Sequence, residues 1–297
     1  MSTDAAVDAA ELARWIGRIE VATDIVTAAP CAALAATLDR DPARPPAGTP
    51  LPPLWHWLYF LPLTRASDIG ADGHSRRGGF LPPVALPRRM WAGGRFVFHA
   101  PLRVGDAMTR TSTIEDVAVK QGRSGTLAFV TVRHDIVRDA DGTLALTEHH
   151  DIVYRDAPSA NAVPASAPVA APAPPGAAWH RIVVPDPVML FRYSALTFNG
   201  HRIHYDRSYV TGTEGYPGLI VHGPLLATLL VDLLRAERPA ASLARFEFRA
   251  LRPVFDLASF TVCGAPRAAT NDVRLWIRDP EGRLAMDATA MLCDAAM

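Results

Sequence analysis

Two blocks of residues recur in the same order in the two halves of this chain, and this repeat constrains the fold more than any other feature. Residues 96–100 (FVFHA) match residues 246–250 (FEFRA). Further on, residues 138–146 match residues 278–286, at an offset ten residues smaller. Two matches in one order indicate that a single unit was duplicated, with a longer excursion between the blocks in the first copy.

A linker separates the two copies. Residues 157–178 consist almost entirely of Ala, Pro, Ser and Val and have no periodic apolar face. Such a stretch cannot bury a core and is typical of extended, exposed chain. The sequence therefore predicts an N-terminal unit at residues 1–156, a linker at 157–178 and a C-terminal unit at 179–297.

Each unit is predicted to end in antiparallel strands, because its later segments are rich in Val, Ile, Thr and Phe. The first unit has such segments at residues 95–99, 109–119, 127–137 and 144–154, and the second at 245–251, 259–263, 273–278 and 284–292. Asp141-Gly142 and residues 280–282 supply the hairpin turns.

A helix is expected before the strands of each unit. Residues 224–236 (PLLATLLVDLLRA) are apolar nearly all round, which predicts a buried helix. In the first unit, residues 9–38 are predicted to be helical with a break at Pro30. One buried helix wrapped by an antiparallel sheet is the hotdog arrangement. The sequence therefore predicts an α+β chain with a double hotdog fold, whose two sheets join into one.

Composition excludes several classes of function. Thirty basic side chains equal thirty acidic ones, so the chain lacks the basic excess of a nucleic-acid binder. Three scattered cysteines indicate reduced thiols and a cytoplasmic location, and no paired spacing suggests zinc. The most apolar stretch, residues 218–234, is too short and too polar for a membrane span. We therefore expect neither a nucleic acid nor a membrane as partner.

The densest polar cluster in an apolar setting is residues 191–206 (FRYSALTFNGHRIHYD), and residues 222–224 (HGP) follow at the start of the predicted helix. Here the chain resembles the MaoC-like, hydratase 2 type, enoyl-CoA hydratases. Their motif has Tyr, two or three residues, then Ser-Gly-Asp-x-Asn-Pro-Leu-His, and a His-Gly pair begins their hotdog helix. In this chain Thr197 stands at the Ser position, Phe198 at the Gly, Asn199 at the catalytic Asp, His201 at the Asn, Arg202 at the Pro, Ile203 at the Leu and His204 at the catalytic His.

The residue sequence of the cluster is most similar to that of one subgroup, which comprises the mesaconyl-C4-CoA and itaconyl-CoA hydratases and the 3-hydroxyacyl-thioester dehydratases. Residues 87–94 (PRRMWAGG) in the first unit resemble the same subgroup. The resemblance implies a hydro-lyase that reversibly hydrates an enoyl-CoA to a 3-hydroxyacyl-CoA. A short, branched or dicarboxylic acyl group is expected. Coenzyme A would belong to the substrate, and no cofactor or metal is expected.

The residues themselves fit this chemistry. Hydration needs a base for water, an acid for C2 and donors for charge on the thioester oxygen. His204 can exchange a proton near neutral pH. The N–H of Gly223, before Pro224 at a helix start, could form an oxyanion hole, although Gly223 could also serve only helix entry. Asn199 can orient water but cannot transfer a proton.

Other residues of the motif have weaker assignments. Asp206 is a possible orienting partner of His204, because residues two apart on an extended segment share a face; the resemblance does not supply this role. His201 could line the site or pack a loop, and His222 is expected to bind substrate. Tyr193 is a candidate for substrate binding, but a core tyrosine with a bonded hydroxyl is the simpler interpretation.

The first unit has no counterpart of the motif, so we expect it to shape the acyl pocket. Trp91 and the aromatic residues of segment 55–60 (WHWLYF) are candidates for its lining, although each could be ordinary core. Arg88 and Arg89 could be a solvated pair, or one of them could bind a coenzyme A phosphate or a substrate carboxylate.

Two other functions stay open on the sequence. Hotdog proteins include acyl-CoA thioesterases, but these use a carboxylate that is absent at Asn199. A degenerate hydratase that only binds acyl thioesters would explain the loss of the Asp, whereas His204 and the His222-Gly223 pair argue for catalysis. A homodimer of two double hotdogs is a further expectation.

Overall fold

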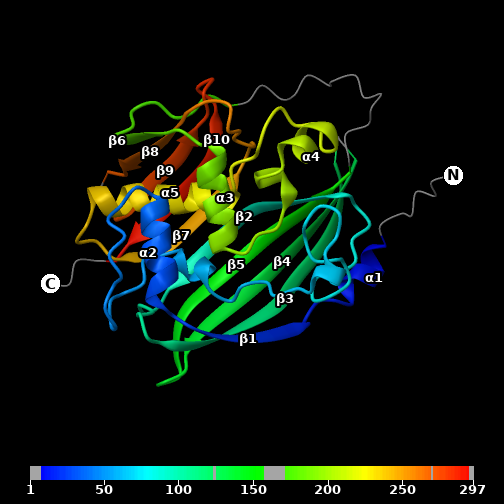
Figure 1. The fold of residues 1–297 in the computed structure, drawn as a ribbon, viewed down its shortest axis with the longest axis horizontal. Helices are drawn as coiled ribbons and strands as arrows, with labels where there is room; N and C mark the ends of the chain where they lie inside the picture. Colours follow the sequence, from blue (N-terminus) through cyan, green and yellow to red (C-terminus); the bar gives the residue numbers. More distant parts are fainter. Residues whose placement is uncertain (1–7, 123–124, 157–170, 269, 294–297) are drawn as a thin grey trace.

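Ten antiparallel strands form one continuous sheet in the computed structural model, which describes residues 8–122, 125–156, 171–268 and 270–293 (Figure 1). Across the sheet the strands follow the order β1-β3-β4-β5-β2-β7-β10-β9-β8-β6. The first five are β1 (Ile19–Ile25), β2 (Arg88–Phe98), β3 (Ala107–Gly122), β4 (Gly125–Arg138) and β5 (Thr143–Arg155). The others are β6 (Trp179–Val183), β7 (Leu243–Ala250), β8 (Phe260–Pro266), β9 (Asp272–Arg278) and β10 (Leu284–Leu292).

The two units meet where β2 pairs with β7, and the repeated residues face each other there. Phe96 lies directly opposite Phe246 in the antiparallel register, with ring centroids 6.0 Å apart. Since these two residues are equivalent in the repeat, a pseudo-two-fold axis passes between them. The prediction of a double hotdog with one joined sheet is therefore confirmed.

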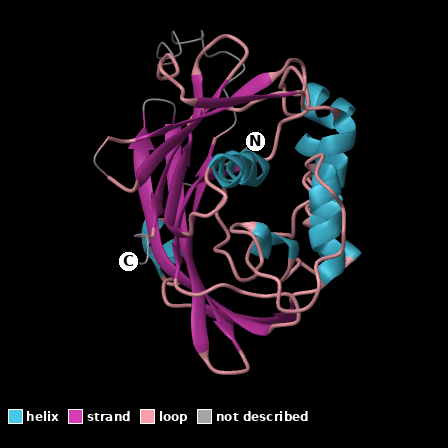
Figure 2. Ribbon diagram, turned by 90° about the vertical axis from the view of Figure 1, so that its left-hand side faces the viewer, coloured by secondary structure: helices cyan, strands magenta, loops and turns pink. Residues whose placement is uncertain are grey.

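One face of this sheet carries the main helices. They are α2 (Ala28–Thr37), α3 (Pro187–Leu196) and α5 (Gly223–Glu237), while α1 (Ala9–Ala13) and α4 (Arg207–Gly212) are shorter. Figure 2 shows α5 end-on beside the curved sheet, with α2 and α3 forming an outer layer. All residues of α5 from Leu225 to Leu234 are buried, as its all-round apolar sequence predicts.

The N-terminal segment differs from the prediction of one helix at residues 9–38. Residues 19–25 form strand β1, which pairs with β3, and α2 begins only at Ala28. Ile19, Val21 and Ile25 alternate with polar residues, the two-residue period of a strand. Pro30 does not break a helix, because it lies in the first turn of α2, where its missing N–H costs nothing.

The first unit also lacks a long central helix among its described residues. Instead the segment at residues 51–87, which contains the 3₁₀ turns η1 (Trp55–Leu58) and η2 (Ala66–Asp68), covers the inner face of its strands. Each predicted strand is present. β3 and β4 span 16 and 14 residues against 7 and 7 for β8 and β9, which accounts for the longer excursion in the first copy.

The predicted linker is only partly within the described residues. Residues 157–170 lie outside them, whereas Pro172 forms a β-bridge with Arg283, so the last part of the segment lies against the second unit. Strand β6, which follows it, was not predicted.

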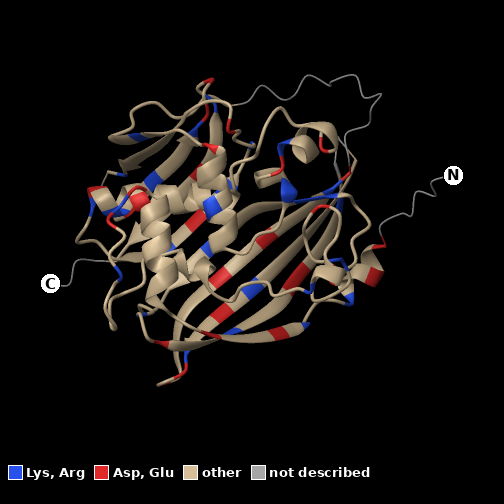
Figure 3. Ribbon diagram, in the orientation of Figure 1, with Lys and Arg blue, Asp and Glu red and all other residues tan. Residues whose placement is uncertain are grey.

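A buried carboxylate fixes α5 to both units. Asp232, whose side chain is 1% exposed, lies 2.8 Å from Arg40, which follows α2, and 2.8 Å from Arg181 of β6. Basic and acidic residues are otherwise interspersed over the strands and loops (Figure 3). No helix in the described ranges is long and apolar enough to cross a membrane.

Candidate active site

The polar cluster begins in the last part of α3 and continues as a tight loop that ends at the start of α4. Phe198 has a left-handed backbone (φ 49°), and the Asn199 Oδ1 accepts a hydrogen bond from the His201 N–H at 3.0 Å. This short-range bond is the usual way in which Asn stabilises a turn. The 3₁₀ turn η3 (Arg202–His204) follows and directs His204 inward, where it is buried.

His204 is held in one tautomer by the backbone. Its Nδ1 lies 2.7 Å from the carbonyl oxygen of Ile220, which can only accept, so Nδ1 carries the proton. Nε2 is therefore a hydrogen-bond acceptor. Burial lowers the pKa of His204 to about 4, only partly opposed by the bond to Ile220, so the imidazole is neutral near pH 7.

His222, the N-cap residue of α5, packs face to face against His204, with ring centroids 3.7 Å apart. Its Nε2 lies 2.8 Å from the Ser194 hydroxyl, and its side chain is fully buried. Burial and the neighbouring imidazoles hold the pKa of His222 well below its usual range. His222 thus packs on one face of the His204 ring, and its role in substrate binding stays a prediction.

Tyr193 packs against His222. Its ring meets His222 edge-on at 5.0 Å, it is only 2% exposed, and its hydroxyl is bonded to Thr228. The simpler expectation for this residue, a core tyrosine with a satisfied hydroxyl, describes its position.

Gly223 is the first residue of α5, one position earlier than expected, and Pro224 is the second. The N–H groups of the first helical turn have no carbonyl partner within the helix, and the helix dipole adds partial positive charge there. A Cβ built on Gly223 would meet no atom within 4 Å, so space is open beside it. An acceptor could therefore reach this N–H close to His204.

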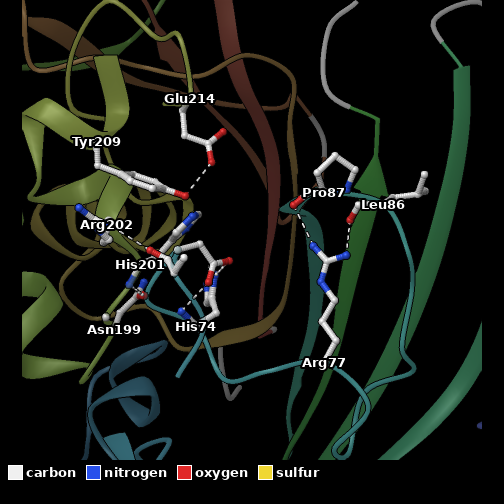
Figure 4. A network of polar contacts seen from close by, with 12 residues as sticks. His74, Arg77, Leu86, Pro87, Asn199, His201, Arg202, Tyr209 and Glu214 are labelled. Carbon is white, nitrogen blue, oxygen red and sulfur yellow. Dashed lines mark hydrogen bonds and ion pairs between the residues drawn. The ribbon is translucent and has the colours of Figure 1, made fainter. Parts of the chain in front are cut away.

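The first unit contributes two residues that the sequence did not single out. The loop at residues 70–74 packs so tightly on the motif loop that a Cβ on Gly73 would lie 1.8 Å from the Gly200 carbonyl oxygen. The Asp72 carboxylate accepts a hydrogen bond from His74 Nδ1 at 3.1 Å, and the rings of His74 and His201 are 4.0 Å apart (Figure 4). No local pattern could reveal this contact, because it joins segments in different units.

These side chains form a cluster of neutral imidazoles beside one carboxylate. Burial lowers the pKa of His201 to about 2, and the neighbouring His74, His204 and Arg89 lower it further because they disfavour a positive charge there. Burial also lowers the pKa of His74. The ligand atoms of Asp72, His74 and His201 lie within 4.8 Å of one another, a spacing that could hold a metal ion. In the structure Asp72 and His74 are instead bonded to each other.

Asp206 does not orient His204, and this prediction was wrong. The segment is not extended, since His204 ends a 3₁₀ turn and Asp206 is the N-cap of α4. The Asp206 carboxylate is bonded to the Arg202 guanidinium, the Ser208 hydroxyl and the Tyr209 N–H. The Nδ1 of His204 is already bonded to Ile220.

A cavity of about 500 Å³ adjoins the loop at residues 70–77, and both Arg88 and Arg89 line it together with His74. Arg88 donates to the Glu214 carbonyl oxygen at 2.6 Å, lies 3.5 Å from the Glu214 carboxylate and stacks on the Tyr216 ring. The two adjacent arginines are therefore not a solvated pair. Arg88 holds the chain after α4, whereas the Arg89 guanidinium forms no hydrogen bond or ion pair with any described residue.

Trp91 lies half-buried two residues further along β2. The centroid of its ring lies 3.9 Å from that of His150 and 5.2 Å from that of Trp57. Trp91 and Trp57, both candidates for the lining of the acyl pocket, are therefore in contact. Trp57 and His56 in turn bond the buried Glu148 carboxylate. The role of Trp91 in lining an acyl pocket stays a prediction.

Comparison with known proteins finds relatives that are named as hydratases or dehydratases of acyl thioesters. The chain is 48% identical to the mesaconyl-C(4)-CoA hydratase of Chloroflexus aurantiacus, over 96% of this chain and 99% of that protein. It is 30% identical to the mitochondrial hydroxyacyl-thioester dehydratase type 2 of Schizosaccharomyces pombe, over 72% of this chain and 78% of that protein.

Solved structures share the fold at low sequence identity. A MaoC-like dehydratase has a TM-score of 0.66 at 14% identity, covering 96% of this chain and all of that one. HtdX of Mycobacterium tuberculosis has a TM-score of 0.63 at 19% identity, covering 92% of this chain and all of that one. Another protein from that organism, described as having a double hotdog fold, has a TM-score of 0.53 at 14% identity. The alignment covers 94% of this chain and 96% of that one.

The match to a family of known activity covers more than half of the chain. It extends over residues 54–256 and so includes the loop at residues 70–74, the motif loop and all of α5. With the relatives above, it confirms the resemblance drawn from the sequence motifs. The chain belongs to the hydroxyacyl-thioester dehydratase type 2 family, a group of MaoC-like enzymes that add or remove water at acyl thioesters.

Proposed function

We propose that this protein hydrates a short, branched, dicarboxylic enoyl-CoA, with mesaconyl-C4-CoA as the representative substrate, and catalyses the reverse dehydration. The observation that carries the proposal is the fixed tautomer of His204, whose Nδ1–H is bound to Ile220 and whose Nε2 is an acceptor beside the start of α5. The identity of 48% over nearly the whole chain supports the acyl group.

In the hydration direction, water would donate a hydrogen bond to His204 Nε2 and lose a proton to it as the oxygen attacks C3. The imidazolium formed keeps its Nδ1–H on Ile220 and returns the Nε2 proton to C2, so that the elements of water are added across the double bond. A neutral imidazole is required at the start, which agrees with the lowered pKa of His204.

Negative charge develops on the thioester oxygen between these two events. The Gly223 N–H at the N-terminus of α5 is the donor that we assign to this oxygen, because the helix dipole favours an anion there and the space beside Gly223 is open.

Asn199 would hold the water without exchanging a proton. Its Oδ1 is used by the His201 N–H, so its amide N–H₂ remains to donate to the water oxygen. The reaction as written uses no metal or cofactor. We further propose that the protein is cytoplasmic and forms a homodimer of two double hotdogs.

A panel of thioesters tests the proposal. The purified protein is incubated with mesaconyl-C4-CoA, itaconyl-CoA, crotonyl-CoA and a longer linear enoyl-CoA, and loss of the conjugated-thioester absorbance is followed. We expect the fastest loss with mesaconyl-C4-CoA, unchanged by a chelator such as EDTA. Release of free thiol would instead indicate a thioesterase. Binding without any turnover in the panel would indicate a non-catalytic acyl-thioester protein.

A further inference from the structure

Arg89 lines a cavity in which no described carboxylate forms an ion pair with its guanidinium. Four arginines line this cavity, Arg76, Arg77, Arg88 and Arg89, against the carboxylates of Asp72 and Glu214. Asp72 is bonded to His74, and Glu214 pairs with Arg88. The Arg77 guanidinium donates to the carbonyls of Val84, Leu86 and Pro87, so it holds a loop.

Arg89 also points toward the proposed site. It lies two residues before Trp91 on β2, and side chains two apart on a strand share a face. Trp91 packs against the core on the inner side of the sheet. The charge of Arg89 contributes to lowering the pKa of His74, His201 and His150, after the larger effect of burial on each. Arg89 also lines the same cavity as His74, so a half-buried cation lies beside the imidazole cluster.

Two groups of the proposed substrate could meet this cation. One is a phosphate of coenzyme A, which is separated from the thioester by the full length of the pantetheine arm. The other is the free carboxylate of mesaconyl-C4-CoA, which is attached to C3 of the enoyl unit, the carbon that receives water. Arg89 and His74 line one cavity, and ring contacts lead from His74 to His201 at 4.0 Å and from His201 to His204 at 5.5 Å, which favours the carboxylate at C3 over a phosphate a pantetheine length away.

We propose that Arg89 binds the free carboxylate of a dicarboxylic enoyl thioester and thereby selects this substrate class. The guanidinium presents its donors in the planar fork that matches a carboxylate. A bound carboxylate would also fix C3 relative to His204. This inference rests on the proposed function and adds to it the residue that decides acyl specificity.

A matched pair of substrates tests the inference. In 3-methylcrotonyl-CoA a methyl group replaces the free carboxylate of mesaconyl-C4-CoA, and the rest of the molecule is the same. For Arg89→Gln we expect kcat/KM for mesaconyl-C4-CoA to fall on the order of 30- to 100-fold, the range for losing a charge-assisted hydrogen bond. The value for 3-methylcrotonyl-CoA should stay within about two-fold of wild type or rise. Arg89→Lys should lie between, since it keeps the charge without the fork.

Arg76→Gln is the matched control, because Arg76 is exposed, lines the same cavity and also carries one positive charge. It should leave the ratio of the two kcat/KM values unchanged. If turnover of the neutral thioester is too slow to measure, dissociation constants of both thioesters on a His204→Gln background supply the same comparison.

Equal losses of Arg89→Gln on both substrates would overturn the inference, because the arginine would then serve a coenzyme A phosphate that both carry. No loss on either substrate would overturn it as well. A wild-type protein that hydrates neither thioester would contradict the proposed function itself, which is a separate result.

Discussion

His204 and His222 lie face to face, with ring centroids 3.7 Å apart and an angle of 19° between the ring planes. His222 is fixed in turn by Ser194, at 2.8 Å. One face of the His204 ring is covered by His222 and its Nδ1 is bonded to Ile220, so Nε2 is the nitrogen that remains for a proton transfer.

Replacing His222 by Ala should therefore misplace His204 without removing it. We expect kcat to fall about ten-fold, because small displacements of a catalytic group are costly, while KM changes little. Steady-state kinetics with mesaconyl-C4-CoA measures both values. Ser194→Ala, which removes only the hydrogen bond behind the stack, should give a smaller loss. A wild-type kcat for His222→Ala would show that the stack has no positioning role.

The pH dependence of kcat/KM should reflect the lowered pKa of His204. The neutral imidazole is the proton acceptor, so activity is present above the folded-state pKa and is lost as pH falls through about 4. At pH 5.5 the enzyme should retain most of its activity. A histidine with the usual pKa near 6.5 would be about nine-tenths protonated at that pH. An activity midpoint near pH 6.5 would contradict the neutral, buried state of His204.

Substitutions of Asn199 separate water holding from proton transfer. Asn199→Asp retains an oxygen for the His201 N–H and adds the carboxylate found in related motifs, so activity should survive with a changed pH profile. Asn199→Ala removes both the turn bond and the donor to water, and should lower kcat by roughly ten-fold or more. If Asn199→Asp is inactive although folded by circular dichroism, the amide donor has a larger role than we assign to it.

The buried carboxylate of Asp232 should matter for stability, not for chemistry. Asp232→Ala leaves Arg40 and Arg181 without their shared partner and should lower the free energy of unfolding by about 3 kcal/mol. This value lies at the low end of the range for breaking a buried ion pair, because the side chains of both arginines are about one third exposed. Asp287→Ala is the control, since Asp287 pairs with Arg274 at the surface and should cost less than about 1 kcal/mol. Equal denaturation midpoints for the two variants would contradict this account.

Much of the fold was predictable because it depends on patterns within single segments. The repeat that contains Phe96 and Phe246 predicted two hotdog units with one joined sheet, and the uniformly apolar sequence after Pro224 predicted α5. The strand at Ile19–Ile25 was missed because its alanine-rich flanks favour helix, and because pairing with β3, a contact distant in sequence, decides its structure.

The residues of the candidate site also fall into those that the sequence revealed and those that only the structure revealed. His204, His222 and Gly223 were found from their match to the motifs of the MaoC-like hydratases, and the structure brings them together at the start of α5. Asp72 and His74 could not be found, because only the packing of Gly73 on Gly200 places them there. Asp206 was misjudged because an extended segment was assumed where the chain makes a 3₁₀ turn. Only the structure distinguishes Arg88, which pairs with Glu214, from Arg89.

The rate at which His204→Gln hydrates mesaconyl-C4-CoA tests the central claim most directly. Glutamine is close to imidazole in size and can bind water, but it cannot accept a proton. Absorbance of the conjugated thioester is followed for wild type and variant at pH 7, with circular dichroism to confirm that the variant folds. We predict rapid hydration by the wild type and a kcat at least about one hundred-fold lower for the variant. Hydration by a folded His204→Gln at close to the wild-type rate would contradict the account.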